Sequence, residues 1–166
     1  LAAQAFDLDN FVDDVVATCR ALVMENGNEL LVERGSGLGV VIGDATKLRQ
    51  AVLNLLSNAA KFTKQGRVVL RAARETSAGG DWISIAVRDT GIGIGRENLP
   101  KLFQNFNQAE ASTSSRYGGT GLGLALSQKL CRMMGGEITV ESELGHGSCF
   151  TIRVPAALAS AASRAA

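Results

Sequence analysis

The stretch from Lys47 to Lys61 constrains the fold most, because its apolar residues recur at the spacing of an α-helix. One stripe of this helix would face a hydrophobic core, and its members are Leu48, Val52, Leu55, Leu56, Ala59 and Phe62. Asp44 stands in front of the stretch as a suitable N-cap residue, and Thr63 to Gly66 would end the helix. The pattern therefore predicts one long amphipathic helix packed on other elements.

A second face of the same helix carries Asn54, Asn58 and Lys61, at positions i, i+4 and i+7. Asparagine is a poor residue inside a helix, because its amide competes for backbone hydrogen bonds. A plain solvated face would more naturally carry Glu, Lys or Gln. Amide oxygens suit a hard cation and a lysine suits a phosphate. The stripe is thus either a solvated surface or part of a nucleotide site.

Composition limits the classes of protein that fit. The chain has 166 residues, 46% hydrophobic and 20% charged, which is enough for one globular domain. A net charge of +1 argues against a nucleic-acid partner or direct membrane contact. We find no apolar run near the ~20 residues of a membrane span and no signal-peptide pattern, so we expect a cytoplasmic domain, whether or not its parent protein is membrane-bound.

The three cysteines, Cys19, Cys131 and Cys149, are widely spaced and set among apolar residues. We expect them to be buried free thiols of a reducing compartment. With a single histidine, they cannot form a familiar zinc site.

The first part of the chain predicts a helix and two short strands. Asp7 to Glu25 has helical apolar spacing, with Asp9 or Asn10 as its N-cap residue. The short β-type runs Glu29 to Arg34 and Val40 to Ile42 are joined by a glycine-rich turn, which predicts a hairpin.

The rest of the chain completes an α+β two-layer sandwich. Alternation predicts strands at Arg67 to Glu75, Trp82 to Arg88, Glu137 to Glu141 and Ser148 to Val154, the last two as a hairpin, and a helix at Leu122 to Met134. We expect a mixed sheet of about five strands plus a short hairpin, covered on one face by three helices. The domain would occupy residues 1–155, with residues 156–166 as a tail that packs little.

Between Thr90 and Thr120 the periodic pattern stops, apart from a short helical piece around Glu97 to Phe103. A loop this long inside a compact domain is usually a functional lid or a disordered segment.

Asp89 is followed by a run of glycines, Asp89-Thr-Gly-Ile-Gly-Ile-Gly95. A carboxylate at the end of a buried strand can accept a hydrogen bond from an exocyclic amine, while glycines let a flat ring approach the backbone. Such a site suits adenine and disfavours guanine, whose carbonyl would face the carboxylate. The alternative is a simple Asp-x-Gly turn.

A second glycine run, Gly118-Gly-Thr-Gly-Leu-Gly-Leu124, leads into the predicted helix. Glycines in front of a helix leave backbone N–H groups free for phosphate oxygens, although a flexible hinge has the same composition. Neither run has the Rossmann spacing, and the P-loop ending is absent. A nucleotide site here must be of another type.

Taken together and in order, these segments resemble the sequence boxes of sensor histidine kinases. Asn54, Asn58 and Lys61 match the N box and Asp89-x-Gly-x-Gly the G1 box. Phe103-x-x-Phe106 matches the F box, Gly119-x-Gly-x-Gly the G2 box, and Gly145-His-Gly-Ser-Cys-Phe150 the last glycine box. The resemblance implies the catalytic, ATP-binding domain of a two-component histidine kinase. This domain has the Bergerat fold, shared with type II topoisomerases, a class of heat-shock chaperones and the MutL repair proteins.

The resemblance implies a role for each matching residue. Asn58 would be the protein ligand of Mg²⁺, and Asn54 and Lys61 would approach the phosphates of ATP. Asp89 would hold the adenine amine. The base would be lined by Gly91, Gly93 and Ile94, and the phosphates held around Gly119, Thr120, Gly121, Leu122, Gly123 and Leu124. Phe103 and Phe106 would seat an ATP lid. Arg116, late in that lid, is either a positive group that reaches the γ-phosphate or a solvent-exposed lid residue. Ser148 stands where the family often has Thr.

Asn54 bears on the type of reaction. The ATP-hydrolysing relatives have Glu there as a general base, and an amide cannot take a proton at neutral pH. A histidine acceptor needs less activation than water, so Asn54 favours phosphotransfer over hydrolysis. The acceptor would lie on a separate dimerisation domain, through which the kinase forms a homodimer, and a receiver domain would take the phosphate next. His146 lacks the family's acceptor context. An ATP-gated pseudokinase and an ATPase are the alternatives.

Overall fold

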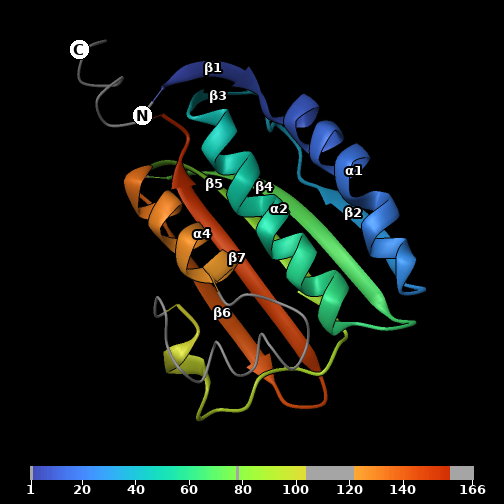
Figure 1. Ribbon diagram of the computed structural model, residues 1–166. Coiled ribbons are helices and arrows are strands. Elements are labelled where there is room, and N and C mark those ends of the chain that lie inside the picture. The colour runs from blue at the N-terminus through green and yellow to red at the C-terminus, as the bar shows by residue number, and fades with distance from the viewer. Residues whose placement is uncertain (1, 78, 104–121, 158–166) are drawn as a thin grey trace.

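The computed structural model describes residues 2–77, 79–103 and 122–157, in which three helices lie on one face of a five-stranded sheet (Figure 1). The helices are α1 (Leu8–Glu25), α2 (Ala45–Phe62) and α4 (Leu122–Met133), and a short 3-10 helix spans Leu99–Lys101. The strands are β1 (Gln4–Asp7), β2 (Glu29–Arg34), β3 (Val40–Gly43), β4 (Arg67–Ser77), β5 (Gly80–Asp89), β6 (Glu137–Glu143) and β7 (Gly147–Pro155).

The main sheet has the strand order β2-β4-β5-β7-β6. Its β2–β4 pair is parallel and the other pairs are antiparallel, so the sheet is mixed. A second, two-stranded sheet joins β1 and β3. The predicted α+β architecture is therefore confirmed, including the β6–β7 hairpin.

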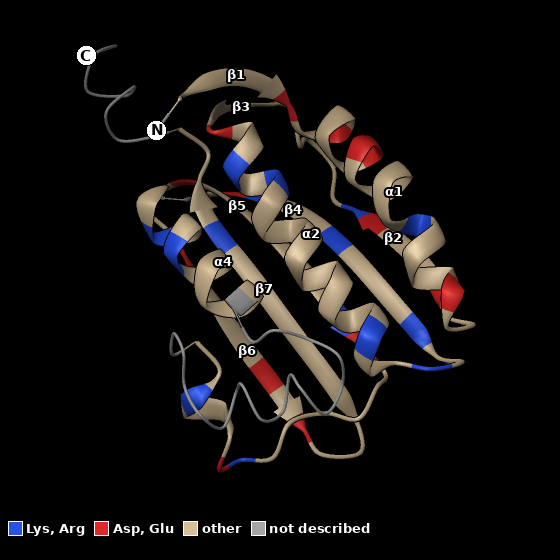
Figure 2. Cartoon of the chain, viewed as in Figure 1, with Lys and Arg blue, Asp and Glu red and all other residues tan. Residues whose placement is uncertain are grey.

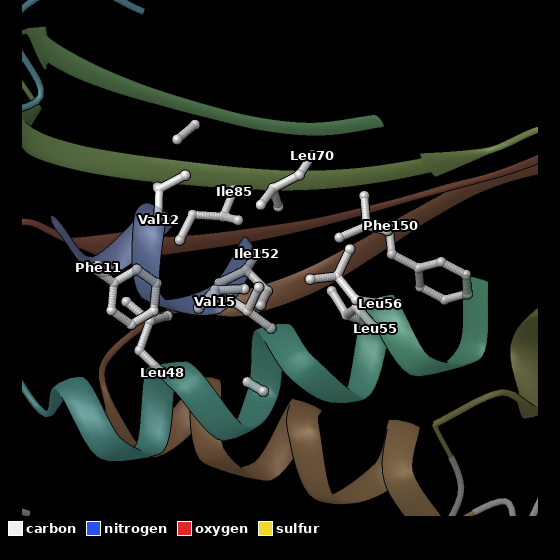
Figure 3. Close-up of a cluster of buried hydrophobic side chains, with 14 of the residues drawn as sticks. Phe11, Val12, Val15, Leu48, Leu55, Leu56, Leu70, Ile85, Phe150 and Ile152 are labelled. Atoms are coloured by element: carbon white, nitrogen blue, oxygen red, sulfur yellow. The ribbon is translucent and has the colours of Figure 1, made fainter. Parts of the chain in front are cut away.

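The core lies between the helices and the sheet (Figure 3). The predicted stripe of α2 is buried there, with Leu48, Leu55 and Leu56 each at most 2% exposed, while Phe62 is only half-buried. Inward residues of the central strands, such as Ile85 and Ile152, meet this stripe from the sheet. Burial of this apolar surface is the main force that holds the two layers together.

The first helix begins earlier than predicted. Asp7, and not Asp9 or Asn10, is its N-cap residue, and its carboxylate accepts a hydrogen bond of 2.9 Å from the Asn10 N–H. The difference arises because Leu8 is already helical and fully buried, so the apolar stripe begins directly after Asp7.

The predicted hairpin of Glu29–Arg34 and Val40–Ile42 is wrong. The first segment pairs in parallel with β4, and the second pairs with β1. Arg74 holds the linker between them, because its Nη1 donates to the carbonyl oxygens of Leu38 and Val40, each at 2.7 Å. The glycine-rich linker has the composition of a hairpin turn, whereas the true partners of the two strands, β4 and β1, leave no local sequence signal.

The chain leaves β7 towards the small sheet. Ala156 is buried, and its carbonyl accepts a hydrogen bond of 2.9 Å from the Ile42 N–H on β3. The start of the expected tail therefore packs on the domain.

The cysteines are free thiols. Cys19 and Cys131 are buried as predicted. Cys149 is only half-buried, so the prediction that it is buried was wrong. Burial raises the pKa of Cys131 to about 12, which leaves it protonated and unreactive. Among the helices of the described ranges, none is both long and apolar enough to cross a bilayer.

Candidate functional site

The polar stripe of α2 meets the first turn of α4. Asn54 is half-buried, and its amide nitrogen donates to the Ser127 hydroxyl at 3.1 Å and to the Gly123 carbonyl at 3.4 Å. Gly123, from the second glycine run, thus lies at the α2–α4 contact, and Leu124 next to it packs against the core. The structure brings the end of this run to the asparagine face, as the nucleotide hypothesis requires.

Asn58 and Lys61 continue the stripe towards the end of α2. Asn58 is half-buried and Lys61 exposed, and neither side chain forms a hydrogen bond or ion pair with another described residue. A single neutral amide oxygen fits Mg²⁺, which usually keeps several waters and takes its other ligands from substrate phosphates. The described residues contain no cluster of three or more His, Cys, Asp or Glu side chains that could hold a metal without such help.

Asp89 lies at the end of β5 and is only 7% exposed. Its Oδ1 accepts a hydrogen bond of 2.9 Å from the Gly91 N–H. Burial raises the pKa of this carboxyl above its ordinary value, while the Gly91 and Ser148 N–H groups and the Thr63 hydroxyl act in the opposite direction. A desolvated carboxylate with these few donors can accept a further hydrogen bond from a ligand amine.

The glycines after Asp89 are required by close backbone packing. A Cβ at Gly91 would lie 2.2 Å from the Phe62 carbonyl oxygen, and one at Gly93 would lie 2.1 Å from the Glu143 carbonyl oxygen. Gly93 also has a φ of +72°, which disfavours other residues. The close approach that the glycines permit in the structure is therefore to protein backbone, and their contact with a base stays a prediction.

Ser148 is part of a small hydroxyl network beside Asp89. It pairs with Asp89 across β5 and β7, and its hydroxyl lies 2.7 Å from that of Ser142 on β6. The Ser142 hydroxyl also accepts from the Ile94 N–H at 2.8 Å, which fixes the predicted Ile94 to the hairpin. Ser142 was not predicted, because the predicted strand ended at Glu141, whereas β6 continues to Glu143 and pairs Ser142 with Ser148.

Next to this network lies an open cleft of about 470 Å³, lined by Ile94, Arg96, Ser142, Glu143 and Leu144. Further along the chain, the Phe103 ring packs edge-on to Phe150, with 6.4 Å between the ring centroids. This contact ties the segment after Gly95 to β7.

Most of the remaining predicted site residues lie outside the part of the chain that the structure describes. Phe106, Arg116, Gly119, Thr120 and Gly121 lie outside the described residues, and Leu122 is described only as the first residue of α4. Thr63, which the sequence reasoning did not include, is 1% exposed at the end of α2 and acts on Asp89. No sequence signal distinguishes it from an ordinary helix-ending threonine.

In the cartoon of Figure 2, the positions of Lys and Arg and those of Asp and Glu are interspersed over the helices and strands. The site therefore depends on individual groups placed at the ends of α2, β5 and α4.

Comparisons with known proteins agree with this arrangement. The family model described as histidine kinase-, DNA gyrase B-, and HSP90-like ATPase matches residues 43–158. The chain is 49% identical over 113 residues to the sensor histidine kinase RcsC of Escherichia coli strain K12, covering 68% of this chain and 12% of that protein. It is 35% identical over 161 residues to hybrid signal transduction histidine kinase B of Dictyostelium discoideum, covering 96% of this chain and 8% of that protein.

Among solved structures, full-length ShkA in complex with AMPPNP superimposes with a TM-score of 0.81 at 33% identity, covering 96% of this chain and 32% of that one. The chain thus spans about a tenth of the two curated relatives. Since the family model covers most of the chain, and the relatives and fold agree with it, this chain belongs to the histidine kinase-, DNA gyrase B- and HSP90-like ATPase family, as a catalytic ATP-binding domain of the sensor histidine kinase type.

Proposed function

We propose that this domain, residues 1–155, binds Mg·ATP along α2 and transfers the γ-phosphate to a histidine on a separate dimerisation and phosphoacceptor domain. The observation that carries this proposal is the buried Asp89 carboxylate at one end of α2, with Asn58 and Lys61 along the same helix, whose side chains have no hydrogen-bond or ion-pair partner among the described residues. A purine site and a phosphate site would then share one helix.

The purine would lie at the Asp89 end. The carboxylate accepts the exocyclic amine of adenine, and guanine would place a carbonyl oxygen there instead, so ATP is favoured over GTP. Gly91, Gly93 and Ile94 would line the base, supported by the hydroxyl network of Ser148.

The triphosphate would run from there towards Asn54. Phe62 lies eight positions after Asn54 on α2, a rise of about 12 Å, which leaves room for an extended nucleotide. Lys61 would neutralise phosphate charge, and the glycine run ending at Gly123 would offer backbone N–H groups. Asn58 would supply the protein oxygen to Mg²⁺, and the bound ion would neutralise charge on the phosphates.

The chemistry is phosphoryl transfer. A neutral imidazole nitrogen of the acceptor forms the new N–P bond while the bond from the γ-phosphorus to the bridging oxygen of ADP breaks, and ADP leaves. Asn54 cannot act as a general base for water, so hydrolysis should be slow. Arg116 is proposed to steady the γ-phosphate.

The partners follow from this reaction. The acceptor domain would also hold the kinase as a homodimer, and a response-regulator receiver domain would take the phosphate from the acceptor histidine. Relatives named as hybrid kinases are consistent with such partners. This role requires ATP, so we propose that the domain is located in the cytoplasm, where ATP is available.

The test has two parts. Calorimetry should detect ATP binding in the presence of Mg²⁺, and an Asp89→Asn variant should bind at least about tenfold more weakly, the loss expected for one hydrogen bond to a charged group. Radiolabelled γ-phosphate should then pass to a separately supplied acceptor domain from a related histidine kinase.

Different outcomes separate the rival functions. Tight ATP binding with no transfer to any supplied acceptor domain would indicate a pseudokinase. Rapid release of inorganic phosphate without an acceptor would indicate an ATPase. Absence of ATP binding would remove the proposal altogether.

A further inference from the structure

Among the described residues, the Thr63 hydroxyl is the only buried side-chain polar group without a hydrogen-bond partner. An unsatisfied buried hydroxyl is unfavourable, so native proteins retain one mainly where it has a further use. Thr63 lies directly after α2, at the point where the helix meets the loop that follows Asp89.

The backbone of Thr63 is held in place independently of its hydroxyl. Its carbonyl accepts a hydrogen bond of 2.8 Å from the Asn28 amide, and the Asn28 Oδ1 accepts from the Gly66 N–H at 2.9 Å. The methyl group Cγ2 faces Gly66, where an added Cβ would lie 2.8 Å away. The side chain therefore has a defined direction without any bond from Oγ1.

That direction is towards the Asp89 loop. A Cβ at Gly91 would lie 2.6 Å from the Thr63 Oγ1, so the hydroxyl rests against the residue whose N–H binds Asp89. The hydroxyl is also among the groups that lower the pKa of the Asp89 carboxyl, although its geometry falls short of a hydrogen bond. It is close to the carboxylate but has no hydrogen-bond partner among the described residues.

We propose that Thr63 is a positioning residue of the purine site, whose hydroxyl donates to the Asp89 carboxylate when that carboxylate binds the exocyclic amine of the purine. The inference rests on the proposed function. With the amine bound and water excluded, Asp89 must stay ionised, and a charge-assisted hydrogen bond then gains strength. The hydroxyl, which has no partner among the described residues, would be satisfied in that complex, so its removal should weaken binding of the amine without lowering the stability of the domain.

The test compares Thr63→Val, which removes the hydroxyl and keeps the shape, with Thr63→Ser, which keeps the hydroxyl. Calorimetry measures the affinity of each for Mg·ATP and for purine riboside triphosphate, which lacks the amine. Thr63→Val should bind ATP about tenfold more weakly, the loss expected for one hydrogen bond to a charged group. Its affinity for the analogue should be unchanged, its melting temperature without nucleotide should not fall, and Thr63→Ser should behave like the wild type.

A merely structural threonine would give another result. Equal loss of affinity for ATP and for the analogue, or no loss for either, would overturn the inference. Should the valine variant not fold, Thr63→Ala removes the hydroxyl without adding volume and permits the same comparison. A wild-type protein that binds ATP no better than the analogue would refute the Asp89–amine contact itself, and a wild-type preference left intact by Thr63→Val would refute only the role of Thr63.

Discussion

The Asn54 amide nitrogen on α2 donates a hydrogen bond of 3.1 Å to the hydroxyl of Ser127 on α4. Ser127 is fully buried, and α4 begins where the second glycine run ends. The bond therefore fixes the first turns of α4 against the helix that carries Asn58 and Lys61. The same residue that we propose to approach the phosphates also holds the helix that follows the glycine run.

We predict that Ser127→Ala lowers the free energy of unfolding by about 1 kcal/mol, the usual net value of one hydrogen bond. Because Asn54 and Ser127 bond to each other, Asn54→Ala and Ser127→Ala should not be additive, with a coupling of at least about 0.5 kcal/mol in denaturant unfolding. The exposed Thr139 on β6 provides the control, since Thr139→Ala should add simply to Asn54→Ala. Additive effects for the Asn54–Ser127 pair would contradict the contact.

The elements could largely be predicted from the sequence, whereas some of their partners could not. Apolar periodicity located α2, and alternation located β4 to β7, because burial on one face imposes those patterns. The pairing of β2 with β4 and of β3 with β1 joins segments far apart in the chain. Such pairing depends on tertiary packing and on contacts such as Arg74 with the Leu38 and Val40 carbonyls, which no local pattern encodes.

The candidate site likewise has residues that could be predicted from the sequence and residues that could not. Asn54 and Asn58 stood out because asparagine is unusual inside a helix, and Asp89 stood out because a run of glycines follows it. The proposed role of Thr63 rests on the missing hydrogen bond of its hydroxyl, and the packing role of Gly91 and Gly93 on the carbonyls of Phe62 and Glu143 beside them. Burial and close approach are properties of the fold, so these roles became visible only in three dimensions.

We predict that ATP affinity decreases as pH falls through the pKa of Asp89. Burial raises this pKa above its ordinary value of 3.8, and an amine donor stabilises the ionised form, so binding requires loss of the proton. Affinity is thus highest above the raised pKa and declines below it. Calorimetry over a pH series should show this decline for ATP relative to purine riboside triphosphate, which has the same titrating phosphates.

Two variants test whether Asp89 is the titrating group. Asp89→Asn should bind ATP weakly and without this pH dependence, and Asp81→Asn, at the other end of β5, should keep it. Folding stability depends on pH in the opposite direction to ATP affinity. A raised pKa contributes stability that is fully present below 3.8 and is lost as pH rises through the raised value, so the wild type should lose stability relative to Asp89→Asn over that window. A constant difference across the window would exclude a raised pKa.

We predict that Gly93→Ala lowers the stability of the domain much more than Gly145→Ala does. Both glycines have positive φ, +72° and +85°, so alanine strains either position by about 1–2 kcal/mol. At Gly145 nothing lies within 4 Å of an added Cβ, whereas at Gly93 the Glu143 carbonyl oxygen lies 2.1 Å away. Thermal unfolding should therefore show a clearly larger loss for Gly93→Ala. Equal losses would mean that the β6–β7 turn does not constrain the loop after Asp89.

We predict that Asn58→Ala removes most of the gain in ATP affinity that Mg²⁺ provides. The reason is that Asn58 offers a half-buried amide without a hydrogen-bond partner among the described residues, as a single protein ligand to Mg²⁺ would. Asn58→Asp should weaken binding or transfer as well, because the added charge lies near the phosphates. Gln50→Ala, an exposed change on the same helix, serves as the matched control and should leave the Mg²⁺ effect intact. Calorimetry with and without Mg²⁺ measures both affinities, and an unchanged Mg²⁺ effect in Asn58→Ala would assign the metal to other ligands.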